Sequence, residues 1–219
     1  MTSIPKSGLM RRLRRFARDR SGVAYIEFVY ALPVILAIGM YGIEATNLAM
    51  AHMTTSQVAL SLADNASRIG QDSTLSLTQF READANDSFA AAEHQAGRFD
   101  VVGRGRIILS SLEQNDEEGQ WIHWQRCFGD GDYESSYGNQ GDGQTGTDFP
   151  GMGPTGKEVK APPDNAVMFV EVFYRYEPIV MDSLFGEPEL HYTASFVVRD
   201  DRDLTRIYNP SPAATPSTC

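Results

Sequence analysis

Residues 21–43 read SGVAYIEFVYALPVILAIGMYGI, and this stretch decides the fold of the chain. After Gly22 the run is mostly apolar and contains one charged residue, Glu27. A helix needs roughly 20 apolar residues to cross a bilayer, so the run predicts a transmembrane helix. Basic residues stand immediately before it: Arg11, Arg12, Arg14, Arg15, Arg18 and Arg20.

The distribution of charge predicts how the chain is oriented in a membrane. Residues 1–22 carry Lys6, six arginines and Asp19, a balance of +6, whereas the whole 219-residue chain has a formal charge of −10. The rest of the chain therefore carries −16. Under the positive-inside rule the leader lies in the cytoplasm and the acidic bulk lies outside. Nucleic-acid binding needs a basic footprint, so the acidic bulk predicts no nucleic-acid partner.

Glu27 is the unusual residue of the apolar run. A charged group in hydrocarbon costs about 2.5–3.5 kcal/mol on insertion scales, so it usually has a partner or a role. One interpretation is an interfacial side chain that snorkels to water. The other joins it to Gly22, because a basic leader, a glycine and then VAYIEF form the pattern of a type IV prepilin cleavage site.

The wider string RSGVAYIEFVYALPVIL resembles the start of TadE-like proteins, the pseudopilins of Tad (Flp) pilus systems. The matching features are Arg20, Gly22, Glu27, Phe28 and Pro33, and the resemblance covers roughly residues 18–69. It implies a minor pseudopilin, a non-enzymatic subunit for the assembly of adherence pili.

The resemblance also implies a processing step and a set of partners. A prepilin peptidase would cut between Gly22 and Val23, and Glu27 would then be residue five of the mature chain. In related assemblies that glutamate neutralises the new N-terminal amine of a subunit. The implied partners are the peptidase, other pilins or pseudopilins, the inner-membrane assembly platform and membrane lipids. The implied location is the bacterial inner membrane, single-pass with a periplasmic C-terminal domain, or an extracellular pilus.

Two alternatives remain open. The first is an unprocessed bitopic envelope protein whose outer domain binds a partner. The second is a secreted protein, because Ala49-Met50-Ala51 matches the A-x-A pattern of signal peptidase sites. The apolar run is long for a signal peptide, and Glu44 and Asn47 stand just before that site.

The order of elements predicts an α+β fold in which a long N-terminal helix, a pilin-like spine, precedes a small antiparallel sheet with one apolar face. We expect a leader over 1–22, the helix over 23–70 with a kink at Pro33, an outer domain over 71–208 and a Pro-rich tail over 209–219. A seam of small and apolar residues on the helix suits packing against the sheet: Tyr41, Ala45, Leu48, His52, Thr55, Ala59, Leu62, Ala66 and Ile69.

The outer domain predicts a second helix and a set of strands. We expect the helix over 71–97, beginning near Ser73 and Thr74, which are N-cap residue types, and ending at Gly97. Two segments, 99–112 and 120–128, are rich in strand-forming residues and predict a hairpin, with a bulge or twist at Gly103 and Gly105. The clearest alternation of apolar residues lies in 166–177 and 191–199.

Residues 129–163 form a long Gly-rich loop with few apolar residues, a functional surface loop or a poorly ordered one. Its Asp130, Asp132 and Glu134 alternate on a Gly-rich segment, as carboxylates that bind calcium do. The alternative is a solvated acidic loop, because Ser135 stands where an EF-hand has its turn glycine. We therefore predict no metal or other cofactor and keep calcium as a minor candidate.

Chemistry based on cysteine or catalytic motifs has little support. Cys127 and Cys219 both fall in the predicted outer domain, where an oxidising compartment permits a disulfide, although two free thiols are the alternative. The four histidines form no metal or catalytic motif, and the G-x-G-x-x-G match in 141–146 follows no strand. We predict that the chain is not an enzyme.

Overall fold

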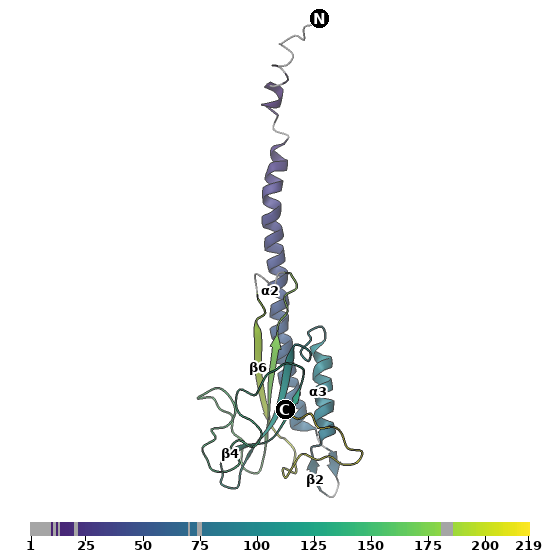
Figure 1. Ribbon diagram of the computed structural model, residues 1–219, viewed down its shortest axis with the longest axis vertical. Coiled ribbons are helices and arrows are strands. Elements are labelled where there is room, and N and C mark those ends of the chain that lie inside the picture. The colour runs from purple at the N-terminus through teal and green to yellow at the C-terminus, as the bar shows by residue number, and fades with distance from the viewer. Residues whose placement is uncertain are drawn as a thin grey trace. The chain divides into compact units, whose positions relative to one another are not determined.

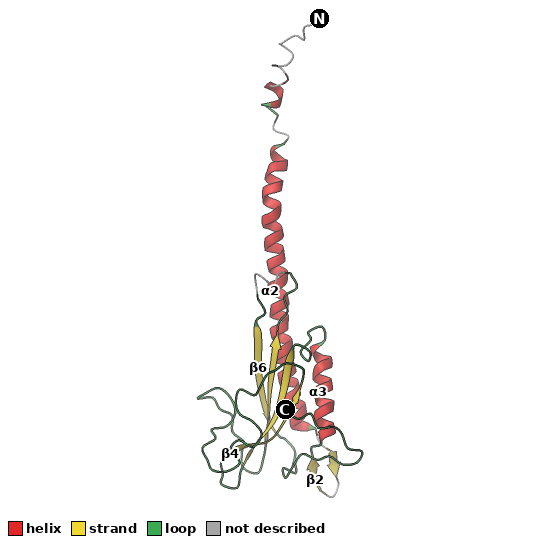
Figure 2. Cartoon of the chain, viewed as in Figure 1, coloured by secondary structure: helices red, strands yellow, loops and turns green. Residues whose placement is uncertain are grey.

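The computed structural model describes residues 10, 12, 14–19, 22–69, 71–73, 76–180 and 186–219. The chain divides into two compact units, Met1–Thr46 and Asn47–Cys219, and each is described by itself. The described elements follow the order helix, hairpin, helix and four-stranded sheet (Figures 1 and 2). The predicted α+β class, with a long apolar helix before a small antiparallel sheet, is confirmed.

One helix, α2 (Val23–Arg68), accounts for the whole predicted spine. It continues through Pro33, where the ring removes one backbone hydrogen bond, and such a loss is tolerated in membrane helices. Gly70, the last residue of the predicted helix, lies outside the described residues. Along the outer part of α2 the predicted seam is buried or half-buried from Leu48 to Ile69, and it is widened by three more buried residues: Ala51, Val58 and Ala63.

The main sheet has the order β4-β3-β5-β6 and is antiparallel throughout. Its strands are β3 (Gly105–Gln114), β4 (Gln120–Phe128), β5 (Val167–Arg175) and β6 (Glu189–Val197). The predicted hairpin of 99–112 with 120–128 is therefore present as β3 and β4. The two alternating segments are present as β5 and β6, and they pair with each other.

The principal core lies between one face of this sheet and the two helices. The face of β5 that was predicted to be apolar is buried there as a set: Ala166, Met168, Val170, Val172, Tyr174 and Tyr176. In β6, Ala194 and the following Val198 are buried, and Tyr192 and Phe196 pack against them half-buried. From α2 the core takes mainly small residues, which allow a close approach of helix and sheet.

The expectation of a sheet with only one apolar face is wrong. The second face carries a smaller core that includes Leu112, Ile122 and Phe169. Its cover comes from the Gly-rich loop 129–163, whose Met152 is fully buried, and the loop adds three half-buried apolar side chains: Tyr137, Phe149 and Val159. A few apolar residues are enough to cover this face of the sheet because they are spread along the loop. The low apolar content of the loop therefore gave no sign of its structural role.

The second helix is shorter than predicted. The segment opens instead with β1 (Gln71–Ser73) and β2 (Ser76–Gln79), which pair antiparallel, and α3 spans Glu82–Ala96. Residues of β2 are held extended because Thr78 N–H donates to Asp201 O (3.0 Å) and Thr78 O accepts Asp203 N–H (2.8 Å). A contact with a chain segment more than 100 residues away is invisible to local sequence patterns. The predicted end at Gly97 is confirmed, with φ +61° at the cap.

The start of the first strand and the place of its irregularity also differ from the prediction. Residues 99–104 form a turn, in which Asp100 O accepts Arg104 N–H (3.0 Å) and Asp100 Oδ1 accepts Gly103 N–H (2.8 Å). β3 begins only at Gly105, so the two glycines end a turn and start a strand. The register shift lies at Ser111/Leu112, where His123 is the extra residue of β4.

Candidate assembly site

The membrane-type segment of α2 is apolar on every side. Each described side chain from residue 23 to residue 43 is exposed, including Tyr25 (77 %) and Tyr30 (75 %). A helix that is hydrophobic all round is stable only when it is buried in lipid or among other apolar groups. Among the described residues it is the one helix long and apolar enough to cross a membrane.

The Gly22–Val23 junction lies where this helix begins. Val23 is the first residue of α2, and Gly22 O accepts the N–H of Ile26 (3.2 Å), as an N-cap carbonyl does. Before it, hydrogen bonds from Arg18 N–H to Arg15 O and from Asp19 N–H to Phe16 O close a turn. No heavy atom lies within 4 Å of a Cβ built at Gly22, apart from its chain neighbours. The junction is thus open, and its glycine is not needed for packing.

Glu27 lies one helical turn beyond Val23, on the same side of the helix. Its side chain is exposed, and within the described part of the chain no hydrogen bond or ion pair engages it. Phe28 is also exposed, at 59 %, next to it. The carboxylate is therefore available to a positive group outside this chain.

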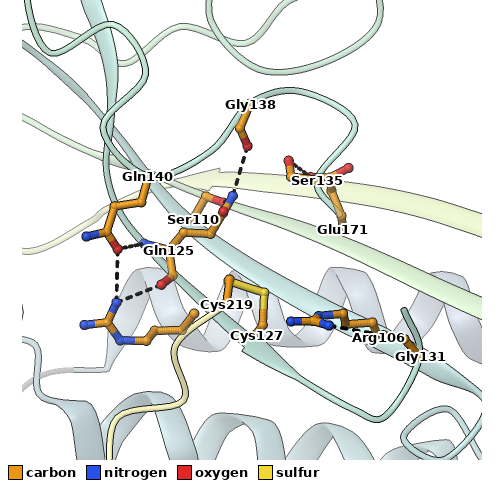
Figure 3. Close-up of a disulfide and its surroundings, with 11 residues drawn as sticks. Arg106, Ser110, Gln125, Cys127, Gly131, Ser135, Gly138, Gln140, Glu171 and Cys219 are labelled. Atoms are coloured by element: carbon orange, nitrogen blue, oxygen red, sulfur yellow. Dashed lines mark hydrogen bonds between the residues drawn. A yellow bond between two sulfur atoms is a disulfide. The ribbon is translucent and has the colours of Figure 1, made fainter. Parts of the chain in front are cut away.

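In the unit Asn47–Cys219, called the outer unit from here on, a disulfide joins Cys127 of β4 to Cys219, with the Cα atoms 4.8 Å apart (Figure 3). It holds residues of the Pro-rich tail against the edge of β4, where Ser217 O accepts Cys127 N–H (2.8 Å). Asn86 of α3 holds the same tail, because its Nδ2 donates to Thr215 O (2.9 Å) and its Oδ1 accepts from Ser217 Oγ (2.8 Å).

The Gly-rich loop covers the rest of that edge. Ile122 N–H donates to Asp142 O (2.9 Å), and Ile122 O accepts the N–H of Gly141 (2.8 Å). Further along β4, Gln140 Oε1 accepts from Gln125 N–H (3.1 Å; Figure 3). Loop and tail together therefore close one edge of the sheet against other chains.

A fully buried carboxylate, Glu171 of β5, anchors the loop to the sheet, and sequence reasoning missed it. It accepts hydrogen bonds from Ser135 Oγ and from Ser136 N–H (3.0 Å), and His191 Nε2 lies 3.3 Å from its Oε1. Ser135 donates to the carboxylate and not to the imidazole, so this set is arranged for anchoring and not for nucleophile activation. The one available signal was a glutamate inside the apolar strand MFVEVFY.

The same carboxylate affects a neighbouring tyrosine of the loop. Burial, and secondarily the negative charge of Glu171, raises the pKa of Tyr137 above its ordinary value. The phenol ring packs edge-on against Phe169, with ring centroids 5.6 Å apart. Tyr137 is therefore neutral at physiological pH and serves as a packing group of the loop.

Two arginines fasten the helices of the outer unit. Arg126 of β4 and Glu82 of α3 form a buried, two-contact ion pair. Arg202 donates to Ala66 O (2.9 Å) and to Ile69 O (2.8 Å), and so satisfies carbonyls at the end of α2. Burial lowers the pKa of the Arg202 guanidinium, but Asp200 and the carbonyls keep it charged.

The calcium candidate is not assembled. Asp130, Asp132 and Glu134 are all exposed, and no set of three or more His, Cys, Asp or Glu side chains in the described residues is placed to hold a metal.

No model of a known protein family matches this chain, and no curated protein or solved structure does so either. Function is therefore argued from the chain's own residues. The exposed groups at the start of α2 are the apolar surface of residues 23–43, the open Gly22–Val23 junction and the Glu27 carboxylate.

Proposed function

We propose that this protein is a minor pseudopilin of a Tad/Flp-type pilus, a structural subunit processed by a prepilin peptidase. The observation that supports it most is the coincidence of three features at one point. The Gly22–Val23 junction lies at the first residue of α2, the helix beyond it is apolar all round, and Glu27 follows at the fifth position.

The chemistry of assembly follows from these features. The basic leader holds the N-terminus in the cytoplasm, and the outer unit lies on the far side of the membrane. Cleavage after Gly22 frees the α-amino group of Val23. The Glu27 carboxylate of a neighbouring subunit then pairs with this amine, which offsets the cost of keeping a carboxylate among apolar side chains. When the helix leaves the lipid, contacts with the apolar helices of other subunits replace its contacts with lipid.

The remainder of the chain supplies a stable outer unit. Hydrophobic clusters on both faces of the sheet, a disulfide and a buried ion pair hold it together. An unprocessed bitopic protein would need the same helix and the same outer unit, but its chain would keep residues 1–22. Processing therefore separates the two functions.

The test compares two glycine variants of the full chain expressed with a prepilin peptidase. Gly22→Leu should abolish the shortening of the chain, whereas Gly39→Leu should be shortened like the wild type. Both glycines have open space around them, so both variants keep the fold. Intact mass measured on membrane fractions reports the outcome. Equal processing of wild type and Gly22→Leu would refute the proposal.

A further inference from the structure

The two edges of the main sheet are treated differently. Loop and tail bond to β4, but within the described residues no backbone hydrogen bond engages the outer edge of β6. The hydrogen bonds from Tyr176 N–H to Pro188 O (3.0 Å) and from Val198 N–H to Ala166 O (2.9 Å) show that even-numbered residues face β5. The odd-numbered residues of β6 therefore direct their N–H and C=O groups away from the sheet: Glu189, His191, Thr193, Ser195 and Val197.

Nothing in β6 protects this edge against pairing. The strand ELHYTASFV has no proline and no lysine, the residues that usually block an edge, and it is nine residues long. Thr193 and Val197 are exposed. A row of unpaired extended backbone groups is satisfied by one kind of partner, another extended strand.

We propose that β6 pairs antiparallel with β6 of a second copy of this chain, with Ala194 of each copy on the two-fold axis. The strand is self-complementary in this register. Tyr192 of each copy lies opposite Phe196 of the other, and Thr193 lies opposite Ser195. Aromatic and hydroxyl pairs across strands each stabilise a sheet.

Neighbouring registers lack this complementarity. An axis at Thr193 places Tyr192 opposite Ala194 and Glu189 opposite Val197, and an axis at Ser195 places Phe196 opposite Ala194. Both lose the aromatic pairs. In the favoured register the odd-numbered residues meet odd-numbered residues, so the free N–H and C=O groups of both copies bond to each other.

The pairing fixes the relative direction of the two copies. β6 runs in the same direction as α2, because Tyr192 contacts His52 (2.9 Å) and Arg199 N–H donates to Ser67 O (3.2 Å). Antiparallel β6 strands therefore bring together copies in which the segments of α2 from His52 to Ser67 run in opposite directions. The pairing uses only the outer unit and stands whether or not Gly22–Val23 is cut.

Cysteine cross-linking of the full chain in detergent tests the register. Ala194→Cys places the two Cα atoms about 4.5 Å apart in a non-hydrogen-bonded pair, a separation that a disulfide spans. Val197→Cys places its copies six residues apart along the strands, about 20 Å. Random collision would favour Val197, which is 45 % exposed, over Ala194, which is 8 % exposed. We expect a covalent dimer from Ala194→Cys alone. Cross-linking of Val197→Cys to an equal extent, or of neither variant, would overturn the proposal.

A proline variant supplies a second, independent test. Thr193→Pro removes an N–H that points away from the sheet, and prolines are tolerated on edge strands, so the monomer should remain folded. The matched control Thr193→Val keeps the N–H. Sedimentation equilibrium in detergent should show a dimer dissociation constant raised about tenfold or more by Thr193→Pro and little changed by Thr193→Val. Equal constants for Thr193→Pro and wild type would contradict the pairing.

Discussion

At residue 27 a carboxylate stands on an otherwise apolar helix, one turn from Val23. Because nothing in the described chain engages it, its removal should leave this fold unchanged. We expect Glu27→Ala to be processed normally and to be incorporated into filaments at least about tenfold less than wild type, the loss expected for a charged contact in low dielectric. Glu27→Gln, which keeps the shape without the charge, should fail to the same degree.

The measurement is the ratio of mature chain in sheared filaments to mature chain in membranes, by quantitative immunoblot. Normal incorporation of Glu27→Ala would show that the carboxylate does not pair with a subunit amine. Normal incorporation of Glu27→Gln together with failure of Glu27→Ala would assign the effect to shape instead.

Asp203 gives a pH-dependent prediction in the outer unit. A hydrogen bond from Tyr208, and then those from Thr205, lower the pKa of the Asp203 carboxyl below its ordinary value. The folded state therefore favours the ionised form: the stabilisation is present above the unfolded pKa and is lost as the pH falls through the lowered pKa. Tyr208→Phe removes the largest cause, so the titration midpoint of Asp203 should move upward. NMR titration of the carboxyl carbon measures this, and an unmoved midpoint would contradict the assignment.

At the scale of elements, the Gly-rich loop acts as a second cover of the sheet. Met152 of the loop is fully buried against the sheet, so Met152→Ala should lower the free energy of unfolding of the outer unit by about 2–5 kcal/mol. Met53→Ala is the matched control, because Met53 is 61 % exposed and its loss should change that free energy by no more than about 0.5 kcal/mol.

Denaturant unfolding followed by tryptophan fluorescence reports both values, since Trp124 lies in the principal core. A Met152→Ala variant as stable as Met53→Ala would mean that the loop does not contribute to the core. The contrast depends on burial alone, because both substitutions remove the same atoms.

Elements with a regular local pattern were predictable from the sequence. The apolar run specified α2, and alternation in 166–177 and 191–199 specified β5 and β6 with the correct buried face. The β1–β2 hairpin was not predictable, because Thr78 is held extended by residues 201–203. The role of the Gly-rich loop was hidden for the same reason, since Glu171 and the sheet face that order it lie elsewhere in the chain.

The same distinction between local patterns and tertiary contacts applies to the candidate functional features. One short stretch of sequence contains Gly22, Val23, Glu27 and Pro33, so a local pattern was enough to single these residues out. The structure places them at the start of an exposed apolar helix. The free edge of β6 needed the sheet order, which no short-range pattern contains. Sequence reasoning therefore found the segment-based features and missed those created by tertiary pairing.

The whole molecule is asymmetric in charge. Residues 1–22 carry a charge of +6 and precede an apolar helix, and the rest of the chain carries a charge of −16. Under the proposed function, removal of these residues at the start of α2 converts a membrane-inserted chain into a filament subunit. Every other element of the proposed function follows from that cut.

The most direct measurement is therefore the N-terminal residue of the protein purified from its native host, by Edman degradation or terminal peptide mass. We predict Val23. An intact leader in cells that contain an active prepilin peptidase would contradict processing and leave a bitopic membrane protein. A chain beginning at His52 would contradict both, because the outer unit would then be a secreted protein.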